Sequence, residues 1–154
     1  MKSKLGIEIV LNTFATDQAI AAYKPDLVVL ATGSAAMPLK IPGNDYLASA
    51  VDVLLGDAAG IGEQVVIIGG SGVGIDLALF LTEKGKSVTV LEMMPTIAFE
   101  LNAYLRSYLQ DLVAEKGIRI VTGCCASQIC PDKVVATLNG EEVTFQCDSS
   151  ISAV

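Results

Sequence analysis

A run of glycines directly after an apolar segment is the first feature of this sequence that could do chemistry. Residues 65–74 read Val-Val-Ile-Ile-Gly-Gly-Ser-Gly-Val-Gly, and Glu92 ends the next apolar segment. A buried strand that ends in glycines lets the backbone turn sharply and approach a phosphate closely. The N–H groups and the positive dipole end of the following helix can then bind that phosphate. This order of residues predicts a dinucleotide-binding unit.

The glycine fingerprint of such units has three positions, which here are Gly69, Ser71 and Gly74. The first glycine makes the tight turn, the second admits the pyrophosphate, and the third lets the helix pack closely on the strand. Ser71 departs from the fingerprint at the second position. Either its side chain crowds the phosphate, or its hydroxyl donates a hydrogen bond to a phosphate oxygen.

Glu92 is the candidate for recognising the ribose. It lies 23 residues after Gly69, close to the spacing of about 20 at which a carboxylate accepts hydrogen bonds from a ribose diol. Its charge would repel a 2′-phosphate, and the next basic residue is Arg106, so the sequence favours NADH over NADPH. The residues expected to contact the dinucleotide are Gly69, Gly70, Ser71, Gly72, Val73, Gly74, Asp76, Glu92 and Met93.

Two of these carboxylates have a structural alternative. Glu92 could be a solvated strand end rather than a ligand contact. Asp76 is expected in the first turn of the helix, where the helix dipole alone favours an acidic side chain. A role for Asp76 in orienting the nicotinamide amide stays open beside that explanation.

Composition excludes several classes of function. The 154 residues carry a formal net charge of −7 with only 10 Lys and Arg, and no basic cluster suggests a nucleic-acid partner. No apolar run is long enough to span a bilayer, and no signal pattern opens the chain, so a cytoplasmic location without membrane contact is expected. The absence of histidine excludes a His-based triad or a His-ligated metal within this chain, and we assign no catalytic residue and no metal site.

The four cysteines, Cys124, Cys125, Cys130 and Cys147, all fall in the last third of the chain. Cys125 and Cys130 have a spacing that some redox-active disulfides also use. A reactive pair needs a stabilised thiolate, whereas these residues flank a turn beside Pro131. The sequence favours reduced, structural cysteines, with a redox or metal role as the alternative.

The pattern of apolar residues predicts an α/β fold with a Rossmann-like βαβαβ parallel sheet and an antiparallel β-meander. The expected strands are 7–11, 27–31, 65–69, 87–92 and 118–122, the expected helices are 16–23, 48–55, 73–84 and 101–116, and the meander comprises 126–130, 133–138 and 142–146. The last helix would bury one face, made by Leu101, Leu105, Tyr108, Leu109, Leu112 and Val113. A further buried strand is expected to begin at the final Ile-Ser-Ala-Val and to run on beyond Val154.

Four segments together resemble a known family. They are Pro-Asp-Leu-Val-Val-Leu-Ala-Thr-Gly at 25–33, Ile-Pro-Gly at 41–43, the glycine turn through Asp76, and Leu-Glu at 91–92. In this order they resemble the pyridine nucleotide-disulphide oxidoreductase superfamily. Within it, Val-Asp-Val-Leu-Leu-Gly at 51–56 is similar to the C-terminal half of NADH:flavin oxidoreductases of the old yellow enzyme branch, such as 2-enoate and 2,4-dienoyl-CoA reductases.

The resemblance implies a fold of the FAD/NAD(P)-binding domain type. Residues 1–62 would be a remnant of an interrupted flavin-binding domain plus a crossing segment, with Gly33 on the flavin side, and residues 63–154 would be the NAD(P)H-binding domain. The parent enzyme would pass a hydride from NADH to a flavin and reduce an activated C=C bond. The family commonly has Gly where Ser71 stands and Glu where Asp76 stands.

The resemblance also implies that parts of the parent lie outside this chain. FAD, FMN and an iron–sulfur cluster are expected only in the full-length parent, with their binding parts before Met1, and the isolated chain is expected to lack catalytic competence. Its expected partners are the dinucleotide and the remainder of the parent enzyme. Exposed apolar surface left by a missing interface would favour self-association.

Two other classes of function share part of this pattern. An S-adenosylmethionine-dependent methyltransferase also has a glycine turn after its first strand and an acidic residue at the end of its second. A non-catalytic nucleotide-binding sensor would need neither a flavin nor hydride geometry. The Ala-Thr-Gly at 31–33 and the prolines before the glycine turn favour the oxidoreductase.

Overall fold

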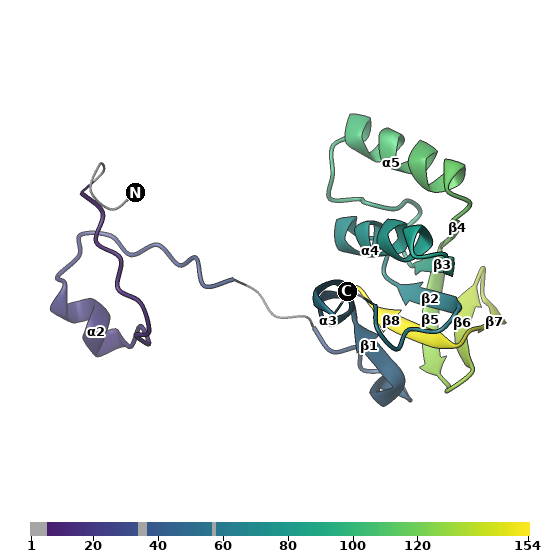
Figure 1. The fold of residues 1–154 in the computed structure, drawn as a ribbon, viewed down its shortest axis with the longest axis horizontal. Coiled ribbons are helices and arrows are strands. Elements are labelled where there is room, and N and C mark those ends of the chain that lie inside the picture. Colours follow the sequence, from purple (N-terminus) through teal and green to yellow (C-terminus); the bar gives the residue numbers. More distant parts are fainter. Residues whose placement is uncertain (1–5, 34–36, 57) are drawn as a thin grey trace. The chain divides into compact units, whose positions relative to one another are not determined.

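The computed structural model describes residues 6–33, 37–56 and 58–154. The chain divides into two compact units, Met1–Ser34 and Ala35–Val154 (Figure 1), and each is considered by itself. The division of the sequence at residues 62 and 63 into parts of two parent domains stays a prediction.

The first unit contains the helix α2 (Asp17–Ala22), which confirms the helix predicted at 16–23. Thr16 caps it, since its hydroxyl accepts a hydrogen bond from the Ala19 N–H at 3.2 Å. The strands predicted at 7–11 and 27–31 are wrong, because neither segment is in a sheet. A strand needs a ladder of hydrogen bonds to a second strand, and the described residues of this unit form no such ladder; Leu30 is 81% exposed.

The second unit is built on a five-stranded parallel sheet in the order β1-β8-β2-β3-β4. Its strands are β1 (Leu47–Ser49), β2 (Gln64–Ile68), β3 (Ser87–Glu92), β4 (Arg119–Thr122) and β8 (Ser149–Ser152). The helix α4 (Gly72–Glu83) joins β2 to β3, and α5 (Ala103–Glu115) joins β3 to β4. The predicted βαβαβ unit is therefore confirmed.

Both crossover helices have polar caps and glycine ends, which explains why sequence patterns locate them well. Asn102 caps α5, because its side-chain oxygen accepts a hydrogen bond from the Leu105 N–H at 3.0 Å. After the helices, Gly85 and Gly117 adopt positive φ angles of 83° and 71°. Glycine takes this conformation at little cost and so ends a helix.

The antiparallel meander is also confirmed. It consists of β5 (Cys124–Ile129), β6 (Lys133–Leu138) and β7 (Glu141–Gln146) in sequence order. Asn139 and Gly140 connect the last two strands with φ angles of 53° and 85°. These positive values fit the tight hairpin turn that an Asn-Gly pair favours.

The parallel sheet is covered on both faces, and the alternation of side chains along β2 shows how. Val65 and Ile67 pack in a core with α3 (Ala50–Leu55), α4 and α5 on one face. Val66 and Ile68 pack in a second core with the meander on the other face. The sheet thus lies between a helical layer and the three-stranded sheet (Figure 1), and this double burial explains the continuous apolar run in the sequence.

Three further expectations need correction. The helix predicted at 48–55 begins only at Ala50, after the short 3-10 helix η1 (Asn44–Tyr46) and the strand β1. The final strand was expected to begin at Ile151, but β8 begins earlier, at Ser149, and its last residue, Ser152, pairs with Ile68 at the end of β2. The predicted apolar face of α5 is mostly unpacked, since Val113 is its one buried residue and Tyr108 is 57% exposed.

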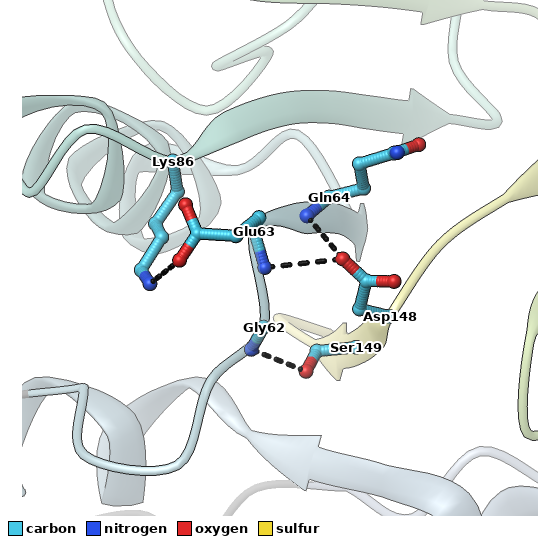
Figure 2. Close-up of polar contacts among 6 residues, drawn as sticks. All are labelled: Gly62, Glu63, Gln64, Lys86, Asp148 and Ser149. Carbon is cyan, nitrogen blue, oxygen red and sulfur yellow. Dashed lines mark hydrogen bonds and ion pairs between the residues drawn. The ribbon is translucent and has the colours of Figure 1, made fainter.

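A cluster of polar contacts holds the amino-terminal edge of the sheet together (Figure 2). The Asp148 carboxylate accepts hydrogen bonds from the N–H groups of Glu63 at 3.1 Å and Gln64 at 2.9 Å. The Ser149 hydroxyl accepts another from the Gly62 N–H at 3.0 Å. The start of β8 is therefore tied to the start of β2.

Candidate functional site

The glycine turn lies at the carboxyl ends of the neighbouring strands β2 and β8. From β2 the chain continues to β3, on the side of β2 away from β8. Gly69 follows β2, and its N–H donates to the Leu91 carbonyl at 2.9 Å. Its φ angle is 107°, and a Cβ there would lie 2.7 Å from the Ala153 carbonyl oxygen. Only glycine meets both demands. The crevice outside this edge is where open α/β sheets bind their ligands.

Gly74 provides the close packing expected of the third fingerprint glycine. It is the third residue of α4, and a Cβ there would overlap the carbonyl oxygen of Gly69. The helix can therefore rest directly on the end of the strand. This contact places the N-terminus of α4, with the positive end of its dipole, beside the end of β2.

Ser71 is the N-cap of α4. Its hydroxyl accepts from the Gly74 N–H at 3.4 Å and donates to the Ala153 carbonyl at 3.2 Å. The hydroxyl is thus engaged with the backbone of this chain. Its two alternative effects on a phosphate stay predictions.

Glu92 is buried rather than solvated, with 8% of its surface exposed. One carboxylate oxygen accepts from the Gly70 N–H at 2.6 Å, and the other accepts from the Met94 N–H at 2.7 Å. A carboxylate has about four acceptor positions, so the two bonds leave capacity for a ligand hydroxyl. Glu92 also fixes the glycine turn against the end of β3.

A cavity of about 220 Å³ brings several of the predicted residues together. It is lined by four of the predicted residues, Gly69, Ser71, Glu92 and Met93. The other lining residues are Leu39, Ile68, Leu91, Met94, Cys124, Cys125, Ala126, Ala153 and Val154. The lining side chains are mainly apolar and include one carboxylate, that of Glu92, and neither Lys nor Arg. Such a site offers an apolar surface for a flat ring and one acceptor for hydroxyl groups.

The other predicted residues lie around or apart from this cavity. Gly70 is in the turn, and Gly72 and Val73 open α4. Asp76 was expected in the first turn of the helix, but α4 begins at Gly72, so Asp76 is its fifth residue and is exposed. Gly33 belongs to the first unit, where it has a φ angle of 82°.

Sequence reasoning missed the segment at 97–100, which lies against the glycine turn. The Ala98 N–H donates to the Gly70 carbonyl at 2.7 Å, and the Gly72 N–H donates to the Glu100 carboxylate at 2.5 Å. Ala98 has a φ angle of 48° and is 1% exposed. No local pattern signals this contact, because alanine rarely adopts a positive φ.

The cysteines differ in environment. Burial raises the pKa of the Cys124 thiol, and the neighbouring Cys125 raises it further. Burial also raises the pKa of Cys147, with smaller contributions from Asp148, Asp132 and Cys130. Cys125 is exposed, and all four thiols are free of disulfides.

The described residues provide neither a group of metal-binding side chains nor a membrane-spanning helix. In the ranges 6–33, 37–56 and 58–154, no three His, Cys, Asp or Glu side chains are placed to hold a metal ion. In the same ranges no helix is long and apolar enough to cross a membrane.

The fold is an α/β fold of the FAD/NAD(P)-binding type. A family model described as pyridine nucleotide-disulphide oxidoreductase matches residues 3–154. The chain therefore belongs to the pyridine nucleotide-disulphide oxidoreductase family, and its relatives are oxidoreductases.

The relatives are much longer proteins. Cinnamate reductase from Clostridium sporogenes is 37% identical over an alignment of 154 positions, which covers 97% of this chain and 23% of that protein. NADH oxidase from Thermoanaerobacter brockii is 37% identical over an alignment of 139 positions, which covers 87% of this chain and 21% of that protein. The solved structure of a 2-naphthoyl-CoA reductase complex superposes with a TM-score of 0.81 at 35% identity, over 99% of this chain and 23% of that one. This chain thus spans about a quarter of the length of these proteins.

Proposed function

We propose that this chain binds NADH and forms the NADH-binding part of a flavin-dependent oxidoreductase. In this proposal the first N–H groups of α4 take the pyrophosphate, and the cavity beside Met93 takes the adenosine end of the dinucleotide. The family assignment supports a pyridine dinucleotide as the cofactor. The methyltransferase alternative has no support among the relatives.

The observation that carries the proposal is the position of Glu92. Its buried carboxylate is held by the Gly70 N–H at one edge of the cavity. A ribose diol in that cavity would donate to the remaining acceptor positions. The carboxylate lies next to the turn that would hold the phosphates. One dinucleotide could therefore contact Glu92 with its ribose and the turn with its phosphates.

The preference for NADH over NADPH rests on charge. A 2′-phosphate carries close to two negative charges and would lie beside the Glu92 carboxylate. The residues that line the cavity include no Lys or Arg to compensate. Bringing like charges together without a counter-charge is unfavourable in a partly buried site, so NADPH should bind more weakly.

The reaction of the whole enzyme is a further part of the proposal. NADH would give a hydride to a flavin, and the electrons would go on to an activated C=C bond, as in the old yellow enzyme branch. The names of the relatives that reduce cinnamate and 2-naphthoyl-CoA are in line with this. FAD, FMN and an iron–sulfur cluster would be held by the remainder of the parent, with Gly33 on the flavin side. The exposed apolar residues of the first unit would favour self-association of the isolated chain.

Calorimetric titration of the purified chain with NADH, NADPH and S-adenosylmethionine tests the proposal. We expect saturable binding of NADH at one site, weaker binding of NADPH and no binding of S-adenosylmethionine. Binding of S-adenosylmethionine without any response to NADH would contradict the proposal and favour the methyltransferase.

A further inference from the structure

The loop between β3 and α5 folds back onto the glycine turn. Ile97 and Ala98 are 2% and 1% exposed, and the Ala98 N–H donates to the Gly70 carbonyl at 2.7 Å. Arg106 holds the far side of this loop, since its guanidinium donates to the Leu101 carbonyl at 2.9 Å. The loop is therefore anchored on both sides of Glu100.

Glu100 uses this position to reach the start of α4. Its carboxylate accepts a hydrogen bond at 2.5 Å from the N–H of Gly72, the first residue of the helix. The side chain is otherwise exposed, and no ion pair joins it to a Lys or Arg in the part of the chain that the structure describes. A negative charge is stabilised at a helix N-terminus, so the carboxylate occupies a position that suits any anion.

We propose that Glu100 is a built-in competitor of the dinucleotide, because its carboxylate occupies the Gly72 N–H that the pyrophosphate would use. This inference rests on the proposed function, and it adds a residue that lowers the affinity of the same site. Binding of NADH requires Glu100 to release Gly72 and move into water. The contact is an exposed one, so the release costs little and tunes affinity rather than blocking the site.

Removing the charge at Glu100 should strengthen binding. An exposed carboxylate at a helix start stabilises by a few tenths to about 1 kcal/mol, and release of this contact corresponds to a change in Kd of about two- to fivefold. We expect Glu100→Gln and Glu100→Ala to bind NADH tighter by about this factor. Glu115→Gln is the matched control, because Glu115 is exposed at the opposite end of α5 and should leave the Kd unchanged.

A second ligand separates competition at the phosphate site from a general effect. Adenosine has no phosphate, so its affinity should be the same in the parent chain and in Glu100→Gln. Circular dichroism spectra of all variants check that the fold is retained. Tighter binding of adenosine as well as NADH would contradict the inference, because the gain would not come from the phosphate.

The contact itself can be observed without NADH. In amide NMR spectra, the Gly72 signal of Glu100→Gln should be displaced from its position in the parent chain, whereas Glu115→Gln should leave it in place. A Gly72 signal at the same position in all three proteins would contradict the contact. If no protein binds NADH, the proposed function fails; if the parent chain binds NADH and Glu100→Gln binds equally or more weakly, only the present inference fails.

Discussion

The substitution Gly74→Ala probes the contact that places α4 on the end of β2. A Cβ at residue 74 would overlap the Gly69 carbonyl oxygen and lie 3.0 Å from the Gly69 carbonyl carbon. These are backbone atoms that cannot rotate away, so the helix must shift off the strand. Such overpacking destabilises the fold by about 1–3 kcal/mol, whereas the higher helix propensity of alanine stabilises it by at most about 1 kcal/mol.

We therefore expect Gly74→Ala to lower the free energy of unfolding by about 1–2 kcal/mol, or the midpoint of thermal unfolding by about 2–8 °C. Gly72→Ala is the matched control in the same helical turn. A Cβ at residue 72 would meet only the Glu100 carboxylate oxygen at 3.2 Å, and that flexible side chain can move.

Urea denaturation, followed by far-ultraviolet circular dichroism, measures the free energy of unfolding of both variants. Gly72→Ala should stay within about 0.5 kcal/mol of the parent chain. Equal stability of the two variants would refute the reasoning, because it would mean that the helix does not rest on the strand at Gly74.

Other expectations concern the polar edge and the thiols. Asp148→Ala should lower the free energy of unfolding by about 1–3 kcal/mol, since the N–H groups of Glu63 and Gln64 lose a charged acceptor. Lys86→Ala should lower the free energy of unfolding by only about 0.2–1 kcal/mol, because Glu63, its ion-pair partner, is exposed. Iodoacetamide should alkylate Cys125 well before Cys147, as measured by peptide mass spectrometry, because burial raises the pKa of Cys147 and lowers its thiolate fraction. The stability contributed by the neutral Cys147 thiol is present below its ordinary pKa of 9.0 and is lost as the pH rises through the higher folded value. The urea midpoint of the parent chain should therefore fall more in alkaline solution than that of Cys147→Ala; equal decreases would show that Cys147 is not responsible.

The local elements of the candidate site could be predicted because their signals are local. The apolar run before Gly69 reflects a strand buried on both faces, and Gly85 ends α4 with the positive φ that glycine permits. The strand β3 was predicted with the bounds that the structure has. Glu92 could be named because it ends a strand at a fixed distance from the glycine turn.

The remaining features depend on partners that are distant in sequence. The run at 27–31 has the composition of a buried strand but no strand beside it among the described residues, and Leu27 is 80% exposed. The last strand, β8, enters the middle of the sheet between β1 and β2, and no periodicity shows which neighbours a strand selects. Glu100 contacts Gly72 from a loop in which Ala98 adopts a positive φ angle, and no sequence pattern indicates either feature.

The central claim is that Glu92 beside the glycine turn selects NADH, and the ratio of the affinities for NADH and NADPH tests it most directly. Glu92→Gln is preferable to Glu92→Ala, because its single amide oxygen can still accept a hydrogen bond from one of the two N–H groups of Gly70 and Met94, whereas alanine would leave both without an acceptor. Glu141→Gln, at an exposed position in β7, is the control. We expect Glu92→Gln to weaken the binding of NADH by about tenfold and to weaken the binding of NADPH less. The ratio of the two affinities should therefore move toward one. An unchanged ratio of the two Kd values in Glu92→Gln would contradict the account.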